Sequence, residues 1–170
     1  VDVEAVFAKF KEGVRQQVAE TDAQSHYDLG VAYKEMGLIN DALTEFELAS
    51  RDPSRECVCH SMAGMMHLEQ GNLEAAIEAF IRGLHAEQKS ADQELALYYE
   101  LGNTYQLRSN PREALFYFQK VMRRDAGYRD VAARVRALQP KPAVAGGPGL
   151  KTAVGEDEFD RAFDDVFGNK

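Results

Sequence analysis

Three segments of this 170-residue chain repeat one pattern of small and aromatic residues, and this repeat limits the fold more than any other feature. Four sets of positions keep the same spacing of 34 and then 38 residues, namely Gly30, Gly64 and Gly102, then Tyr33, His67 and Tyr105, then Ala42, Ala76 and Ala114, then Phe46, Phe80 and Phe118. Four independent sets at one spacing indicate a structural unit that recurs along the chain.

The recurring residues predict pairs of packed helices. The glycines and alanines allow the two helices of a pair to approach closely, and the phenylalanines are expected to fill the space between successive pairs. Gly37 and Gly71 should end first helices as C-cap residues, and Asn110 with Pro111 should begin a second helix. Ser109 replaces the glycine in the third repeat, so we expect its turn to differ.

The repeated segments begin with HYDLG, HSMAG and YYELG, and their spacing resembles that of tetratricopeptide repeats over about residues 22–139. The resemblance implies an all-α fold, a right-handed α-solenoid of three helix pairs. Flanking helices should cover its two ends. The apolar stripes of these two helices are Val3, Phe7, Phe10, Val14 and Val18 before the repeats and Val131, Val135 and Leu138 after them.

Three regions are predicted along the chain. Residues 1–139 form the solenoid with its flanking helices, residues 140–156 form a flexible linker rich in proline and glycine, and residues 157–170 form a short helix. Phe159, Phe163, Val166 and Phe167 share one face of that helix, and acids surround them. We therefore interpret residues 157–170 as a recognition helix, a ligand for a protein surface.

Composition excludes several classes of function. The formal net charge of -8 argues against a surface that binds nucleic acid, because phosphate binding needs a basic field. No apolar run approaches the roughly 18 residues of a membrane span, so no membrane partner is expected, and the start lacks a signal peptide. Cys57 and Cys59 lie two residues apart in a predicted helix and are interpreted as reduced thiols of a cytoplasmic protein.

Catalytic and metal-binding residues are not predicted. No serine, cysteine or carboxylate pair has the partners that nucleophilic or acid-base catalysis needs, so we expect no enzyme activity and no cofactor. The sequence CVCH with nearby His67 matches no usual zinc spacing. His26 and His60 are interpreted as core residues instead. Since the chain starts at Val1, we expect it to belong to a longer protein.

The resemblance places a peptide-binding groove on the first helices of the pairs. Its expected lining residues are Tyr27, Val31, Lys34, Met62, Met65, Tyr99, Asn103 and Gln106. Relatives that grip a terminal carboxylate use cations, whereas the corresponding positions here carry Tyr27, Val31, Met62, Ala96 and Glu100. The groove should therefore accept an apolar helix rather than a carboxylate.

A basic patch near the end of the repeats has two interpretations. It consists of Arg123, Arg124, Arg129, Arg134 and Arg136. These arginines are either a solvated cover of the solenoid end or a surface that binds acids, including those of the chain's own tail.

We interpret the protein as a non-catalytic scaffold that binds a protein or peptide, either a partner's helix or its own tail. The first repeat also resembles large bacterial scaffolds of type IV pilus assembly and cell polarity, including myxobacterial motility proteins. That resemblance implies a polarity factor or a small GTPase as the partner. Two alternatives stay open, a self-associating structural component and a regulatory domain of a larger enzyme.

Overall fold

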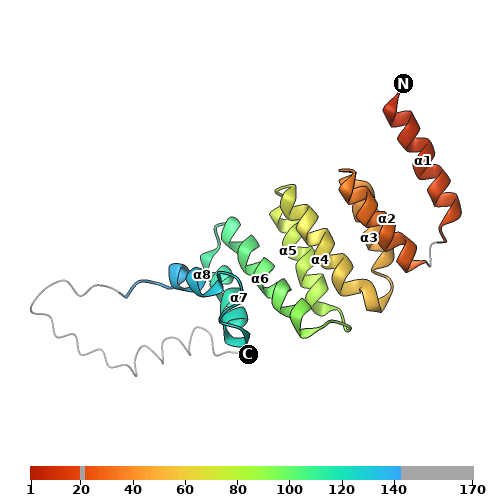
Figure 1. The fold of residues 1–170 in the computed structure, drawn as a ribbon. Helices are drawn as coiled ribbons and strands as arrows, with labels where there is room; N and C mark the ends of the chain where they lie inside the picture. Colours follow the sequence, from red (N-terminus) through yellow and green to blue (C-terminus); the bar gives the residue numbers. More distant parts are fainter. Residues whose placement is uncertain (20–21, 143–170) are drawn as a thin grey trace, which may run out of the picture. The chain divides into compact units, whose positions relative to one another are not determined.

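The structure, a computed structural model, describes residues 1–19 and 22–142. These residues form helices and no strand, and the helices follow one another in chain order (Figure 1). The helices are α1 (Val3–Gln17), α2 (Ala23–Glu35), α3 (Ile39–Ala49), α4 (Pro53–Glu69), α5 (Leu73–His85), α6 (Ala91–Leu107), α7 (Pro111–Arg124) and α8 (Val131–Leu138). The prediction of an all-α solenoid built from helix pairs is confirmed.

The three pairs are α2 with α3, α4 with α5, and α6 with α7, and each pair also contacts the next first helix. The glycine of each first helix lies against the phenylalanine of its own second helix. A Cβ atom on Gly64 would lie 2.4 Å from the Phe80 ring, and the equivalent distances from Gly30 and Gly102 are 2.8 and 2.7 Å. Only a residue without a side chain allows this approach.

The hydrophobic core is divided among the pairs. One cluster joins Phe46 of α3 to Cys59 and Met66 of α4, and another joins Phe80 of α5 to Leu97 of α6. The last cluster joins Phe118 to Val131 and to Val135 of α8. Each cluster therefore includes a helix pair and the helix that follows it.

The turn of the third pair is built like the other two, so the expectation that it differs is wrong. Ser109 has a φ of 61°, close to the 77° of Gly37 and the 74° of Gly71. The same backbone hydrogen bond closes all three turns, at 2.8 Å for Leu38 N to Tyr33 O and 2.9 Å for Asn110 N to Tyr105 O. The serine adopts a left-handed conformation at an energetic cost because the fold requires that turn.

The two flanking helices differ in how far they are buried. Val131 and Val135 of α8 are 0% and 1% exposed, so α8 covers the last pair as predicted. By contrast, α1 has no buried residue, and Val3 and Phe10 are 61% and 50% exposed. Of the predicted stripe, Val3 and Phe10 are therefore exposed, whereas Phe7, Val14 and Val18 are half-buried.

Two further points complete the description of the fold. Most of the predicted linker and all of the predicted recognition helix lie in residues 143–170, outside the described residues. In the part that the structure describes, no helix has the length and apolar character required to cross a membrane.

Candidate protein-binding surface

The residues predicted to line the groove belong to α2, α4 and α6, and we call the surface they form the first-helix face. Its members are Tyr27, Val31, Lys34, Met62, Met65, Tyr99, Asn103 and Gln106. All are half-buried except Tyr99, which is 6% exposed. Whether this surface binds a peptide stays a prediction.

Apart from Lys34, the α2 and α4 part of the first-helix face is apolar. The ring of Tyr27 meets Phe46 edge-on with centroids 5.8 Å apart, and the Arg55 guanidinium lies 5.5 Å from the Tyr27 centroid. Met62 packs on the cluster around Phe46, and Met65 packs on the cluster around Phe80. Both methionines therefore contribute to the core as well as to the surface, a double role that the sequence pattern does not reveal.

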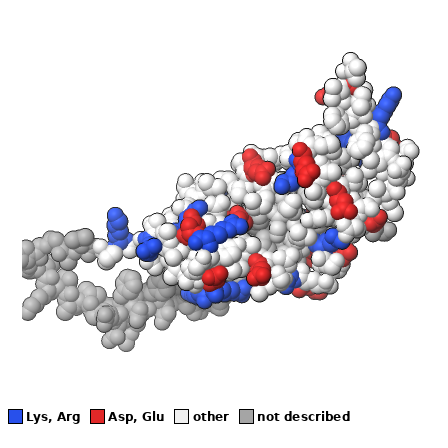
Figure 2. Space-filling view, viewed as in Figure 1, with Lys and Arg blue, Asp and Glu red and all other residues white. Residues whose placement is uncertain are grey.

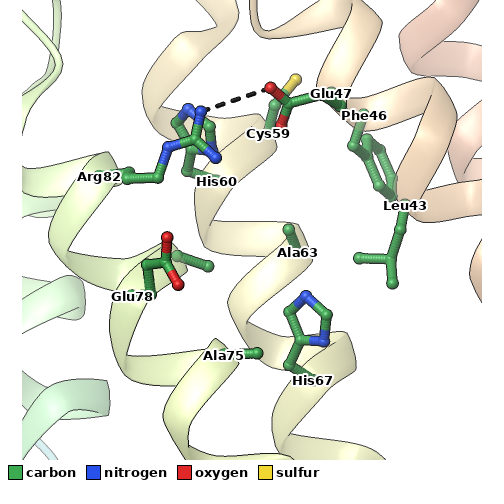
Figure 3. A pocket seen from close by; sticks show the side chains of 11 residues that line it. Leu43, Phe46, Glu47, Cys59, His60, Ala63, His67, Ala75, Glu78 and Arg82 are labelled. Carbon is green, nitrogen blue, oxygen red and sulfur yellow. Dashed lines mark hydrogen bonds and ion pairs between the residues drawn. The ribbon is translucent and has the colours of Figure 1, made fainter.

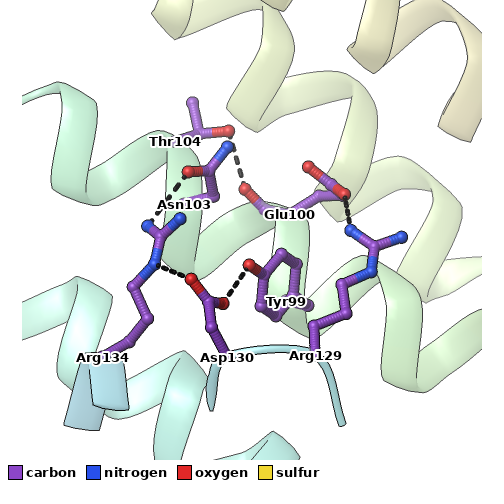
Figure 4. A network of polar contacts seen from close by, with 7 residues as sticks. All are labelled: Tyr99, Glu100, Asn103, Thr104, Arg129, Asp130 and Arg134. Carbon is purple, nitrogen blue, oxygen red and sulfur yellow. Dashed lines mark hydrogen bonds and ion pairs between the residues drawn. The ribbon is translucent and has the colours of Figure 1, made fainter.

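The α6 part of the first-helix face is covered by polar contacts from the segment around α8 (Figure 4). Arg134 donates to Gln106 Oε1 at 2.7 Å and to Asn103 Oδ1 at 3.3 Å. The Tyr99 hydroxyl donates to Asp130 Oδ1 at 2.5 Å, and Arg134 Nε donates to the other oxygen of Asp130 at 3.0 Å. Asn103, Gln106 and Tyr99 thus already have partners within the chain.

The charges of this network shift the pKa values of its members. The hydrogen bond from Tyr99, followed by the one from Arg134, holds the pKa of Asp130 below its ordinary value. Burial, with the bond to Asp130, raises the pKa of the Tyr99 phenol. At neutral pH a carboxylate therefore accepts from a neutral phenol, the protonation pattern that favours this bond.

The five arginines of the predicted basic patch do not act as one group. Arg129 donates to Glu100 at 3.0 Å, and Arg124 donates to Glu94 at 2.8 Å. Arg136 donates to the carbonyl oxygen of Ala132, and Arg123 lies at the junction of α7 and α8. Figure 2 shows acidic and basic side chains interspersed on the side in view. Acid binding by these arginines stays a prediction.

Several large apolar side chains are exposed outside the first-helix face. On α1 they are Val3, Val6 and Phe10, and on α7 they are Phe116 and Met122, which are 50% and 38% exposed. The sequence contained a signal for Phe116, because three successive aromatic residues in one helix cannot all point toward the same core.

The two cysteines, His26 and His60 lie in the core. Cys57 and Cys59 are free thiols, each 1% exposed, and burial raises the pKa of Cys59 to about 11. Such a thiol is mostly protonated at neutral pH and reacts slowly. His26 and His60 are each 5% exposed, as core residues should be. Among the described residues, no group of three or more His, Cys, Asp or Glu side chains is placed to hold a metal ion.

Comparison with known proteins agrees with this architecture. Residues 95–128 match the family model described as tetratricopeptide repeat. Two crystal structures of MamA are similar to the chain, each with 18% identity, a TM-score of 0.61 and 81% of this chain covered, over 75% and 83% of their own lengths. No curated protein matches the chain. The family match covers one repeat, and the likeness to the solved structures shows a shared fold.

Proposed function

We propose that this tetratricopeptide repeat solenoid is a non-catalytic cytoplasmic scaffold whose first-helix face binds an amphipathic helix. The observation that carries the proposal is the division of that face into two parts. Tyr27, Met62 and Met65 provide an adaptable apolar surface on α2 and α4. Arg129 and Arg134 place cations beside its α6 part.

The ligand that fits such a surface combines aromatic and acidic residues. Residues 157–167 of this chain have that composition, and a partner's helix of the same kind is equivalent. In this proposal Phe159 and Phe163 contact the apolar part and the acids turn toward the arginines. Each buried aromatic side chain contributes about 1.5–3 kcal/mol, whereas ordering costs about 1–2 kcal/mol per residue, so the affinity should be modest.

The biological setting that we propose is bacterial cell polarity or pilus-dependent motility, with a polarity factor or a small GTPase as the partner. This part rests on the resemblance of the first repeat to scaffolds of those systems. A pull-down from the native lysate, with and without residues 156–170, tests it. Recovery, in both samples, of proteins that are neither polarity factors nor small GTPases would count against this setting.

Binding to the first-helix face is tested with a labelled peptide of residues 157–167 and a protein of residues 1–142, by fluorescence anisotropy. The double variant Met62→Glu with Met65→Glu should weaken binding at least about tenfold, because it places two charges in the apolar part. Met122→Glu, which adds one such charge on α7 outside this face, is the control. Circular dichroism must show unchanged helicity, since both methionines also pack on the core. Equal binding by a folded double variant would contradict the proposal.

A second candidate function, self-association, is favoured by the exposed apolar residues of α1. Val3, Val6 and Phe10 are 61%, 56% and 50% exposed and share one side of the helix. Monomers with such an exposed apolar helix face should associate at high concentration. Sedimentation velocity of the wild type and of Val6→Glu with Phe10→Glu tests this, and a concentration-independent monomer in the wild type would exclude it.

A further inference from the structure

Grooves lined by residues other than those of the first-helix face lie between neighbouring helices. One is lined by α1, α2 and α3, and the next by α3, α4 and α5. In the third repeat, the equivalent groove lies where Tyr98 and Tyr105 of α6 contact Tyr117 of α7. Because the repeats are offset by 34 and 38 residues, the α2 and α3 residues of the first groove have equivalents in the other two.

One position of the second helix carries a different residue in each of the three grooves. The position is Glu45 in the first groove, Ala79 in the second and Tyr117 in the third. The carboxylate of Glu45 lies 2.5 Å from Nδ1 of His26. The ring of Tyr117 lies nearly parallel to that of Tyr105, with an interplanar angle of 7° and centroids 5.7 Å apart.

The second groove has an alanine at this position and contains a cavity of about 190 Å³ (Figure 3). The first groove also contains a cavity, of about 270 Å³, and Glu45 is one of its lining residues. Three alanines, Ala63, Ala75 and Ala79, leave this space. His67, the equivalent of Tyr105, lines the cavity, and its Nδ1 atom is buried with no hydrogen-bond partner among the described residues. A buried polar atom without a partner is costly, so it favours a ligand that supplies one.

The charged residues of this cavity limit the ligand further. Glu47 and Glu78 contribute two carboxylates, and Arg82 pairs with Glu47 at 3.4 Å. Burial, followed by the charge of Arg82, lowers the pKa of His60, which keeps that imidazole neutral. The lining is therefore slightly acidic and unsuited to an acidic helix such as residues 157–167.

We propose that the cavity, which we call the Ala79 cavity, binds a tyrosine side chain of a partner protein, flanked by basic residues. The third groove shows that a tyrosine ring fits the equivalent place, since Tyr117 occupies it. A phenolic hydroxyl both donates and accepts, so it suits Nδ1 of His67 in either tautomer. The basic neighbours complement Glu47 and Glu78.

The test uses the side chain of tyrosine alone, 4-methylphenol, with toluene as its counterpart without a hydroxyl. The chain has four histidines, so their imidazole signals can be followed individually by NMR. Titration with 4-methylphenol should shift the signals of His60 and His67 and leave those of His26 and His85 in place. Toluene should bind more weakly. Equal shifts with both compounds, or no shift at His67, would overturn the proposal.

The chain supplies a matched pair of variants. Ala79→Tyr gives the second groove the side chain of the third and should weaken 4-methylphenol binding about tenfold or more, because the ring fills the space. Tyr117→Ala makes the opposite change and should create a second site beside Tyr105. Unchanged binding in a folded Ala79→Tyr variant refutes the assignment. If that variant does not fold, Ala79→Leu replaces it in the test, because a leucine side chain should also fill the cavity and weaken binding.

A last comparison separates this inference from the proposed function. Peptides with a central tyrosine and flanking lysines should bind better than the same peptides with glutamates, or with phenylalanine at the centre. Their affinity should be unchanged by Met62→Glu with Met65→Glu, since neither methionine lines the Ala79 cavity. A preference for the acidic peptide would refute the inference and leave the first-helix face untouched.

Discussion

Replacement of Gly64 by alanine should destabilise the protein, and the structure gives the size of the effect. The added Cβ atom would lie 2.4 Å from the ring of Phe80, which is 0% exposed and packs in one cluster with Leu97 and Leu101. Overpacking of this kind costs about 1–3 kcal/mol, and the upper end applies because the distance is far below van der Waals contact. Alanine regains about 1 kcal/mol of helix propensity, which leaves a net loss of about 2 kcal/mol.

The matched control is Gly13→Ala, since Gly13 also lies inside a helix but a Cβ atom there meets nothing within 4 Å. It should leave the protein equally stable or stabilise α1 by up to about 1 kcal/mol. Urea denaturation followed by circular dichroism measures both variants, and the loss in Gly64→Ala corresponds to roughly 4–8 °C in Tm.

A second substitution tests whether the ring is the cause of the loss. Phe80→Leu in the Gly64→Ala background removes the atoms that the new methyl group meets, so the two changes should cost less together than the sum of their separate costs. Additive costs, or a Gly64→Ala protein as stable as the wild type, would refute the reasoning that the glycine permits this contact.

Three further predictions concern single residues. Ser109→Gly should raise the free energy of unfolding in urea by about 1 kcal/mol, because it relieves a left-handed serine, and a lower urea midpoint would contradict this. Tyr99→Phe should raise the pKa of Asp130 toward its ordinary value, as measured by carbon NMR titration. In the wild type this lowered pKa stabilises the fold at pH values above the pKa of the unfolded carboxyl. That stability is lost as the pH falls through the pKa of the folded state. The variant should therefore lose less folding stability on acidification. Cys59, with a pKa of about 11, should react with a thiol reagent at pH 8 only as fast as the protein unfolds, and its stabilising contribution should disappear as the pH rises from the ordinary thiol pKa toward 11.

The helix pairs could be predicted because their determinants are local and repeated. Gly64 and Phe80 are 16 residues apart, and the same separation recurs between Gly30 and Phe46, so the packing contact is visible as a spacing. The turn at Ser109 does not follow from residue type alone, because a serine takes the place of a glycine there. The neighbouring helices impose the left-handed conformation there, whatever residue is present.

The candidate surface was predicted less completely than the fold. Tyr99 occupies a first-helix position, as expected, yet its exposure depends on where Asp130 and Arg134 come to lie. Those residues follow an irregular segment whose path no periodicity fixes. The Ala79 cavity was missed for a related reason, since an alanine leaves a space only when its neighbours are also small.

The division of the core among the pairs has a mechanical consequence. Because each cluster also contains the helix that follows its pair, no pair can leave the stack without exposing part of its neighbour's core. A chain pulled from both ends in an optical trap should first release α1, which has no buried residue, at low force. The pairs should then yield one after another, in steps of about equal length.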